Sequence, residues 1–298
     1  MAVNFTLKQL RYAAAVAQTG HFGRAAALLH VTQPALSQQI QALEALCGGT
    51  LFDRLARGVR LTPFGAEFLD LAQGVLNAAD RLSILVETQA GRPARPLRFG
   101  IIPTVAPYLL PTMFPALTDQ LPGVRFAISE NRTDPLLDGL ASGALDLALI
   151  ASDPRPGGPR LATEPLFHDD FVLATAADDA GRPEPVPLGT MDTSRMLLLD
   201  EGHCFRDQAL AACGLSADSA RTFAATSLST IVEFVANGQG ITLLPEIALR
   251  KETAGDRIQI HRLASPGAGR LLQLVWREAS PYGELFRQIA GIVRGAQP

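Results

Sequence analysis

Two cysteines with charged neighbours are the residues of this chain best suited to chemistry. Cys204 follows Gly202 and His203, which can end a loop and begin a helix, and Arg206 comes two residues later. A helix N-terminus and neighbouring cations both stabilise a thiolate, the nucleophilic form of cysteine. The pattern therefore predicts a reactive thiol, although the same polar neighbours also fit a solvated loop around an inert cysteine.

The second cysteine, Cys213, lies nine residues after the first. If one helix joins them, their α-carbons are about 13 Å apart, because each helical residue advances the chain by about 1.5 Å. A disulfide requires α-carbons about 4.4 to 6.8 Å apart. A bond between Cys204 and Cys213 therefore requires this segment to refold, which is the behaviour expected of a redox switch.

Composition limits the function classes. The chain has 298 residues, 47% of them hydrophobic, enough for two domains with their own cores. We find neither a secretory signal nor an apolar run of about 18 residues, so we expect a cytoplasmic protein with no membrane partner, where disulfides are transient. The five histidines lack metal-ligand spacing and no nucleotide-binding glycine motif is present, so we expect no metal and no other cofactor. The third cysteine, Cys47, is predicted to be a small buried apolar residue.

Charge is distributed unevenly along the chain. Residues 1–60 carry six Lys/Arg against two Asp/Glu, whereas the remainder carries 20 against 27. A basic N-terminal module on an acidic body favours nucleic acid as the partner of the first module.

The elements at the N-terminus are predicted to be three short helices. The first follows the capping residue Thr6 and ends at Gly20, and the second covers residues 22–29. The third follows Thr32, another capping residue, and has Pro34 in its first turn, where proline is tolerated. Two short helices joined by a tight turn indicate a helix-turn-helix.

The third helix predicts a DNA-reading surface. Leu36, Ile40 and Leu43 are spaced to form its buried stripe, which leaves amides and hydroxyls on the outer face. A predicted hairpin with arginines follows and would contact phosphates. The candidate DNA-binding residues are Thr32, Gln33, Pro34, Ser37, Gln38 and Gln41 on the helix and Arg54, Arg57 and Arg60 on the hairpin. An ordinary solvated helix face has a similar composition.

Residues 5–65 resemble the winged helix-turn-helix of LysR-type transcriptional regulators, above all in residues 22–27 (FGRAAA), 31–37 (VTQPALS) and 61–65 (LTPFG). The resemblance implies that the chain binds double-stranded promoter DNA, contacts RNA polymerase and assembles with its own copies as a homodimer or homotetramer. On this basis we divide the chain into a winged helix-turn-helix domain (1–62), a dimerisation linker helix with a hinge (63–96) and a regulatory domain (97–298).

The linker is predicted to be one long helix from Pro63 to about Gln89, because its apolar residues recur at helical spacing. These residues are Phe64, Phe68, Leu71, Val75, Leu76, Leu82 and Leu85, and we expect them to form one seam. Residues 91–96 (GRPARP) then predict a hinge, since proline and glycine cannot extend the helix.

From Leu97 onward, predicted strands and helices alternate, which is typical of an α/β fold with a parallel sheet. We expect the chain to leave a first lobe near Leu166 and to return to it near Leu271. Strands at residues 171–175 and 196–199 are predicted for the second lobe. The pattern resembles the two-lobed, periplasmic-binding-protein-like effector domain of the LysR family, with a cleft between the lobes.

Residues 200–209 (DEGHCFRDQA) with Cys213, and residues 100–111 and 225–228, are similar to the OxyR-type hydrogen peroxide regulators of that family. The resemblance implies that Cys204 reacts with peroxide to a sulfenic acid and that Cys213 resolves it to a reversible disulfide. The residues that it implies for binding or activating hydrogen peroxide are Thr104, Thr133, His203, Arg206, Asp207 and Arg277. Residues 134–135 are Asp-Pro where the related pattern has His-Gln, and Pro135 is expected to shift the helix that presents Thr133.

Two other functions fit parts of the same sequence. A LysR-type regulator can sense a small metabolite in the interlobe cleft, with Cys204 incidental. A thiol peroxidase would use the same cysteine pair with turnover, but a catalyst has no need of a DNA-binding module. We therefore expect a regulator of oxidative-stress genes rather than an enzyme.

Overall fold

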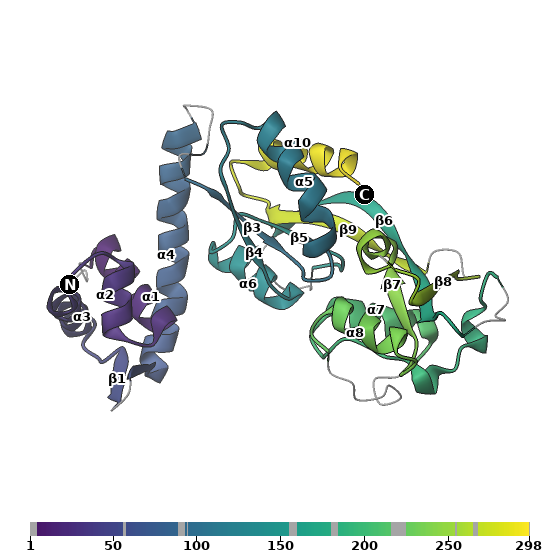
Figure 1. Ribbon diagram of the computed structural model, residues 1–298. Coiled ribbons are helices and arrows are strands. Elements are labelled where there is room, and N and C mark those ends of the chain that lie inside the picture. Colours follow the sequence, from purple (N-terminus) through teal and green to yellow (C-terminus); the bar gives the residue numbers. More distant parts are fainter. Residues whose placement is uncertain are drawn as a thin grey trace. The chain divides into compact units, whose positions relative to one another are not determined.

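The computed structural model describes residues 5–55, 58–88, 93, 95–154, 160–179, 184–215, 225–253, 255–264 and 268–297. The chain divides into two compact units, residues 1–90 and residues 91–298 (Figure 1). Among the described residues, we find no helix with the length and apolar character that crossing a bilayer requires.

The N-terminal unit is a small helical domain with a two-stranded wing. Its elements are α1 (Leu7–Thr19), α2 (Phe22–Leu28), α3 (Gln33–Cys47), β1 (Phe52–Leu55), β2 (Gly58–Leu61) and α4 (Pro63–Thr88). The strands β1 and β2 pair antiparallel, with Phe52 opposite Leu61. The predicted helix-turn-helix and hairpin are thus present, while Arg57 lies outside the described residues.

Local sequence explains where these helices begin. Thr6 and Gln9 form a reciprocal capping box, with the Thr6 N–H donating to Gln9 Oε1 at 2.9 Å. Thr32 occupies the N-cap position of α3, but its side chain makes no capping hydrogen bond, contrary to our expectation. The stripe of Leu36, Ile40 and Leu43 is fully buried, as predicted.

One of the apolar residues predicted for the seam of α4 turns into the core of its own unit. Leu76 is buried in a cluster with Leu10 of α1, and Phe68 packs against the same cluster. Leu71 and Leu82, by contrast, are 69% and 66% exposed. Leu76 therefore departs from the predicted seam, because it helps to close the core of its own unit, whereas Leu71 and Leu82 remain uncovered on another face of the helix. Phe64 and Val75 are also exposed, and the side chain of Leu85 is outside the described set.

The C-terminal unit is a mixed α/β structure. Its strands are β3 (Leu97–Ile101), β4 (Phe126–Glu130), β5 (Leu147–Ile150), β6 (Leu161–Ala176), β7 (Thr242–Pro245), β8 (Ile258–Arg262) and β9 (Gly269–Arg277). Its α-helices are α5 (Ala106–Gln120), α6 (Thr133–Ser142), α7 (Cys204–Cys213), α8 (Leu228–Ala236), α9 (Leu249–Glu252) and α10 (Gly283–Gly295). Short 3-10 helices cover Leu188–Thr190 (η1), Thr193–Arg195 (η2) and Glu246–Ala248 (η4).

The sheet is only partly parallel. Its strand order is β4-β3-β5-β9-β6-β7, and β8 also pairs with β6. Strand β3 runs parallel to β4 and β5, whereas β9 and β6 pair antiparallel with all their neighbours. The prediction of a parallel sheet holds for β3, β4 and β5 and fails where β9 returns the chain from the second lobe.

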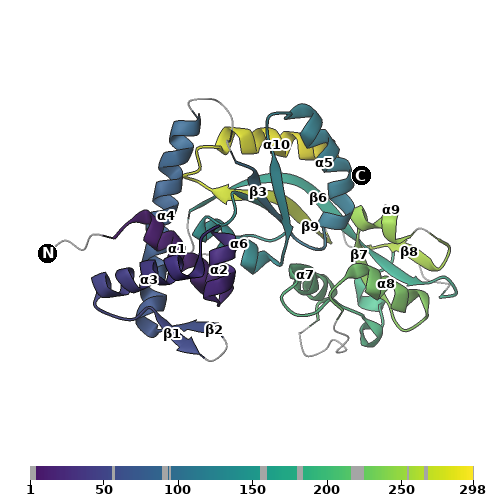
Figure 2. The ribbon, with the colours of Figure 1, turned by 60° about the vertical axis from the view of Figure 1, so that its left-hand side comes forward.

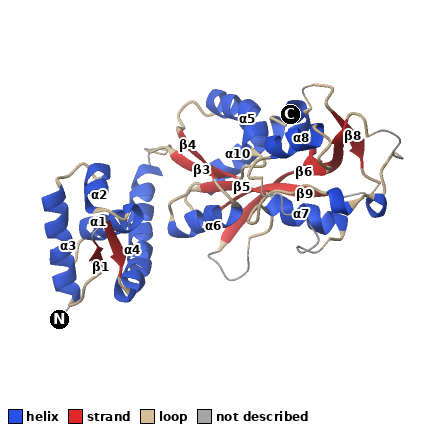
Figure 3. Ribbon diagram, turned by 60° about the horizontal axis from the view of Figure 1, so that its bottom comes forward, coloured by secondary structure: helices blue, strands red, loops and turns tan. Residues whose placement is uncertain are grey.

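Two long strands connect the lobes. Strand β6 pairs with β9 over residues 161–170 and then with β7 and β8 over residues 171–176. The strand predicted at residues 171–175 is thus the end of a much longer one. Residues 196–199, predicted as a strand, contribute only isolated bridges. The first lobe contains β3, β4 and β5 with α5 and α10 on one side of the sheet and α6 on the other (Figures 2 and 3). The second contains β7, β8, α7 and α8.

Candidate functional site

Helix α7 begins at Cys204 and ends at Cys213, so the two cysteines occupy opposite ends of one ten-residue helix. His203 is its extended N-cap residue, and Gly214 ends it with a left-handed φ of 64°. Both thiols are free and partly buried. The single helix predicted between them is confirmed, and its length holds the two α-carbons about 13 Å apart.

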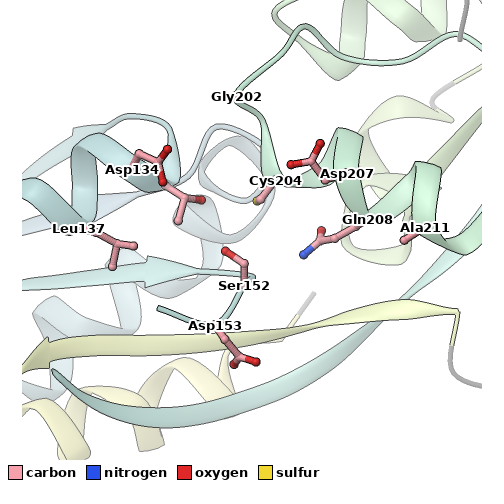
Figure 4. A pocket seen from close by; sticks show the side chains of 10 residues that line it. Asp134, Leu137, Ser152, Asp153, Gly202, Cys204, Asp207, Gln208 and Ala211 are labelled. Atoms are coloured by element: carbon pink, nitrogen blue, oxygen red, sulfur yellow. The ribbon is translucent and has the colours of Figure 1, made fainter. Parts of the chain in front are cut away.

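Cys204 lines a pocket of about 400 Å³ between the lobes. Helix α6 and the end of β5 supply one wall, and α7 supplies the other (Figure 4). The lining residues are Thr133, Asp134, Leu137, Ser152, Asp153, Gly202, Cys204, Asp207, Gln208 and Ala211. Pro135 is the third residue of α6, where its missing N–H needs no helical partner, and the helix begins at Thr133.

Three side chains at this site carry buried polar atoms that have no hydrogen-bond partner within the described part of the chain. They are Thr133 Oγ1, Gln208 Oε1 and His203 Nε2. The amide of Gln208 is held in place, since its Nε2 donates to the Ala151 carbonyl of the first lobe. Buried polar groups are normally paired, so the atoms of Thr133 and Gln208, which line the pocket, mark a place where a small polar molecule can bind, whereas His203 is not among the lining residues.

His203 is buried, and its environment keeps it neutral. Burial lowers the pKa of His203, and the positive charge of Arg132 lowers it further, while Asp200 opposes the shift. The imidazole therefore lies beside Cys204 as a neutral hydrogen-bonding group. It does not supply the positive charge that the sequence suggested.

An ion pair connects the lobes beside the pocket. Arg132, the N-cap residue of α6, has Nη2 at 3.4 Å from Asp200 Oδ2 in the second lobe. The guanidinium crosses over Gly202, where an added Cβ would lie 3.0 Å from Arg132 Nη1. Gly202 also has a φ of 85°, so both its conformation and its contact favour glycine.

Two predicted arginines do not line the pocket. Arg206 donates from Nη1 to the Leu199 carbonyl at 3.0 Å and so orders the chain before α7. Arg277 donates to the carbonyl oxygens of Leu140 and Leu145, at the far end of β9. The prediction that Arg277 lies at the pocket is therefore corrected. Strand β9 runs from the second lobe into the first, and Arg277, its last residue, ties the strand to the end of α6.

Arg270, at the other end of β9, is a buried residue against α7 that the sequence reasoning missed; neither it nor Thr104 is among the residues that line the Cys204 pocket. Its fully buried guanidinium lies 2.9 Å from Asp169 Oδ2 and donates to Thr104 Oγ1 at 2.7 Å. It also lies over the ring of Phe205, 5.2 Å from the centroid. Thr104 is thus buried and positioned by Arg270. The available signal was an arginine at the same alternating position as the buried Leu272.

The predicted DNA-binding residues that the structure describes, all of the set except Arg57, lie on one face of α3, at its N-cap and on the wing. Ser37 accepts a hydrogen bond from Arg54 Nη2 at 3.2 Å, which joins the wing to the helix. Arg54 also packs over the ring of Phe22, and Arg60 lies 3.5 Å from Asp53. The remaining helix residues of the set are all exposed: Thr32, Gln33, Pro34, Gln38 and Gln41.

Family models match both units of the chain. Residues 7–66 match the bacterial regulatory helix-turn-helix protein of the lysR family, and residues 90–297 match the LysR substrate binding domain. A probable hydrogen peroxide-inducible genes activator of Mycobacterium avium is 40% identical over 293 residues, covering 97% of this chain and 93% of the relative. The DNA-binding transcriptional dual regulator OxyR of Escherichia coli K12 is 37% identical over 290 residues, covering 97% and 94%.

Solved structures resemble the chain over nearly its whole length. A full-length OxyR of Pseudomonas aeruginosa with a cysteine-to-aspartate change has a TM-score of 0.78 and 34% identity, covering 98% of this chain and 95% of that one. A hydrogen-peroxide-bound cysteine-to-serine mutant of Corynebacterium glutamicum OxyR has a TM-score of 0.65 and 36% identity, covering 98% and 92%.

Proposed function

Because the chain belongs to the LysR family of bacterial transcriptional regulators, we propose that it switches oxidative-stress genes in response to hydrogen peroxide, with Cys204 as the sensor. The observation that carries this proposal is the position of Cys204 at the start of α7, in a pocket where Thr133 and Gln208 present buried, unpartnered oxygens. The relatives named for peroxide induction support the choice of oxidant.

The first step is nucleophilic attack by the Cys204 thiolate on one peroxide oxygen. The O–O bond breaks, sulfur is oxidised to a sulfenic acid, and hydroxide leaves. Gln208 Oε1 accepts a peroxide O–H, and the Thr133 hydroxyl can accept one and donate one. Thr104 accepts an N–H from Arg270, so its own proton is free to be donated to the departing oxygen. Neutral His203 and Asp207, in the first turn of α7, complete the proposed set.

The second step joins Cys213 to the sulfenic acid and releases water. Burial raises the pKa of Cys213, so in the folded helix this residue is a thiol and not a thiolate at neutral pH. Unwinding of α7 would bring the two sulfurs together and expose Cys213 at the same time. The proposed switch is therefore gated by the stability of one helix.

The output of the switch is DNA binding. We infer that the exposed face of α3 enters the major groove of promoter DNA, with Arg54 and Arg60 on flanking phosphates. The exposed Leu71, Val75 and Leu82 of α4 fit a homodimer contact. Tetramer formation, a contact with RNA polymerase and a cytoplasmic location are further parts of this proposal.

Mass spectrometry of thiol state in the full chain tests the proposal. After stoichiometric hydrogen peroxide, the parent should lose the alkylatable thiols of Cys204 and Cys213 together and keep Cys47. A Cys213→Ser variant should stop at a sulfenic acid on Cys204, and Cys204→Ser should retain both remaining thiols. Unchanged peroxide-dependent footprinting on promoter DNA in Cys204→Ser would exclude the mechanism.

One observation favours a second candidate, a metabolite sensor. The pocket of about 400 Å³ lies within the usual range for small-molecule sites, roughly 300 to 1,000 Å³, and is far larger than hydrogen peroxide. Thermal stabilisation of the parent and of Cys204→Ser by small organic acids, with no thiol oxidation by peroxide, would favour that candidate. Steady-state peroxide consumption with a thiol reductant would point instead to a thiol peroxidase. Because the chain belongs to a regulator family, we do not expect this result.

A further inference from the structure

The Cys204 pocket has acidic residues on the wall opposite its cysteine. Asp134 lies in the first turn of α6, and Asp153 follows β5, so both come from the first lobe. Both side chains line the pocket (Figure 4), and both residues are exposed to solvent. Across from them, α7 adds Asp207. Carboxylates are negatively charged at neutral pH, so a molecule in the pocket faces negative charge on the wall opposite sulfur.

The pocket also contains a buried polar atom that a small polar molecule could pair with. Thr133 is 8% exposed, lines the pocket, and has a buried hydroxyl oxygen with no partner in the described structure. Among the described residues, no group of three or more His, Cys, Asp and Glu side chains is arranged to hold a metal ion. At about 400 Å³ the pocket does not select hydrogen peroxide by size, since larger oxidants also fit. The charge of the pocket wall is a property that can discriminate between hydrogen peroxide and larger, charged oxidants.

We propose that Asp134 and Asp153 form a charge filter that repels anionic oxidants and admits neutral hydroperoxides to Cys204. This inference rests on the proposed function, in which an oxidant reaches that thiol. Arg132, which precedes α6, is paired with Asp200 at 3.4 Å, so part of its charge is already compensated. The filter acts on the approach of the oxidant and leaves the bond-breaking step to the residues around sulfur.

Two peroxides of different charge test the filter with the same chemistry. Hydrogen peroxide is neutral, and its attack by the thiolate yields sulfenic acid and hydroxide. Peroxymonosulfate is a monoanion at neutral pH, and its attack yields the same sulfenic acid and sulfate dianion. In both reactions the O–O bond breaks, sulfur is oxidised and the peroxide oxygens are reduced. The ratio of the two rates therefore reports on the approach of charge.

The experiment is rapid-quench trapping of the Cys204 sulfenic acid in full-length protein carrying Cys213→Ser. Replacing both filter residues (Asp134→Asn with Asp153→Asn) should raise the peroxymonosulfate rate roughly five- to tenfold at low ionic strength, the effect of two charges about 8 Å away in water. The hydrogen peroxide rate should change less than about twofold on the same Coulomb argument. The increase should shrink in about 1 M salt, where the Debye length falls to about 3 Å.

Asp119→Asn with Asp256→Asn is the matched control, because it removes two exposed carboxylates of the same unit that do not line the pocket. Charge reversal (Asp134→Lys with Asp153→Lys) should raise the anionic rate further than neutralisation does. An unchanged rate ratio in the filter variant, an equal change with both oxidants, or an equal effect of the control would overturn the filter. Parent Cys204 that reacts with hydrogen peroxide no faster than a free thiol would instead overturn the proposed function, and the ratio would still measure the filter.

Discussion

At the scale of single residues, the buried pair of Arg270 and Asp169 has the largest consequences. Both side chains are inaccessible to solvent, and the guanidinium also positions Thr104. Arg270→Gln leaves the Asp169 carboxylate buried without its cation, which should lower the free energy of unfolding by about 3 to 5 kcal/mol in urea titrations. Arg277→Gln, which loses hydrogen bonds to two carbonyl groups, should lower it by only about 1 kcal/mol.

The rate of Cys204 oxidation in the same two variants tests whether Arg277, as the sequence predicted, or Arg270, as the structure indicates, supports the reaction. Under conditions where both variants are folded, hydrogen peroxide should oxidise Cys204 of Arg277→Gln at the parent rate, because Arg277 lies at the far end of β9. Arg270→Gln should be slower, and Arg270→Lys should recover part of the rate, because a cation still reaches Thr104. A slow Arg277→Gln beside a normal Arg270→Gln would reverse our assignment.

His203 predicts how stability depends on pH. Its pKa is lowered in the folded protein, first by burial, so the unfolded chain binds its proton more readily. The stability due to neutral His203 is complete above its ordinary value of 6.5 and is lost as the pH falls from there through the lowered value. The urea midpoint of the parent should thus fall between pH 7 and pH 5, and less steeply in His203→Asn.

At the scale of elements, α7 is proposed to be the gate between the two oxidation steps. Gly214 ends it in the left-handed region, and an added Cβ there would meet no atom within 4 Å, so alanine costs backbone energy alone. Gly214→Ala should weaken the end of the helix by about 1 kcal/mol. Because that corresponds to roughly fivefold in an opening equilibrium, disulfide formation should accelerate by up to that factor while sulfenic acid formation does not.

Rapid-quench alkylation after a peroxide pulse measures both steps in that variant. Gly48→Ala is its matched control, since Gly48 ends α3 with a φ of 68° and is equally free of contacts. It should leave both rates unchanged. Equal disulfide rates in Gly214→Ala and the parent would show that opening of α7 does not limit the switch.

At the scale of the whole molecule, Asp146 fixes the start of the regulatory unit. Arg95, just before β3, and Arg98 within β3 both donate to its carboxylate, at 2.7 Å from Arg95 Nη1 and 3.1 Å from Arg98 Nη2. Burial acts to raise the pKa of Asp146, but these hydrogen bonds outweigh it and lower the pKa to about 2. The residues that follow the linker are thereby held to the start of β5.

Asp146→Asn should therefore lower the free energy of unfolding at neutral pH by about 2 kcal/mol. The lowered pKa means that this stabilisation is present above the ordinary value of 3.8 and is lost as the pH falls toward 2. Urea titrations of parent and variant should converge in that range. Asp119→Asn, on the exposed last turn of α5, should match the parent throughout.

The sequence by itself determined the features that depend on local physics. The capping box at Thr6, the buried stripe of α3 and the helix between Cys204 and Cys213 follow from residue type and spacing along one element. The motifs of the N-terminal 65 residues and of the cysteine segment were enough to predict the family.

Only the tertiary structure decided which residues meet across elements. Arg270 rather than Arg277 reaches Thr104, because the direction of β9 between the lobes sets which of its ends faces the cysteine helix. The carboxylates opposite Cys204 come from α6 and from the end of β5, some 50 to 70 residues earlier in the chain. The spacing of residues along a chain fixes neighbours within a helix or strand, whereas the pocket depends on how two lobes pack.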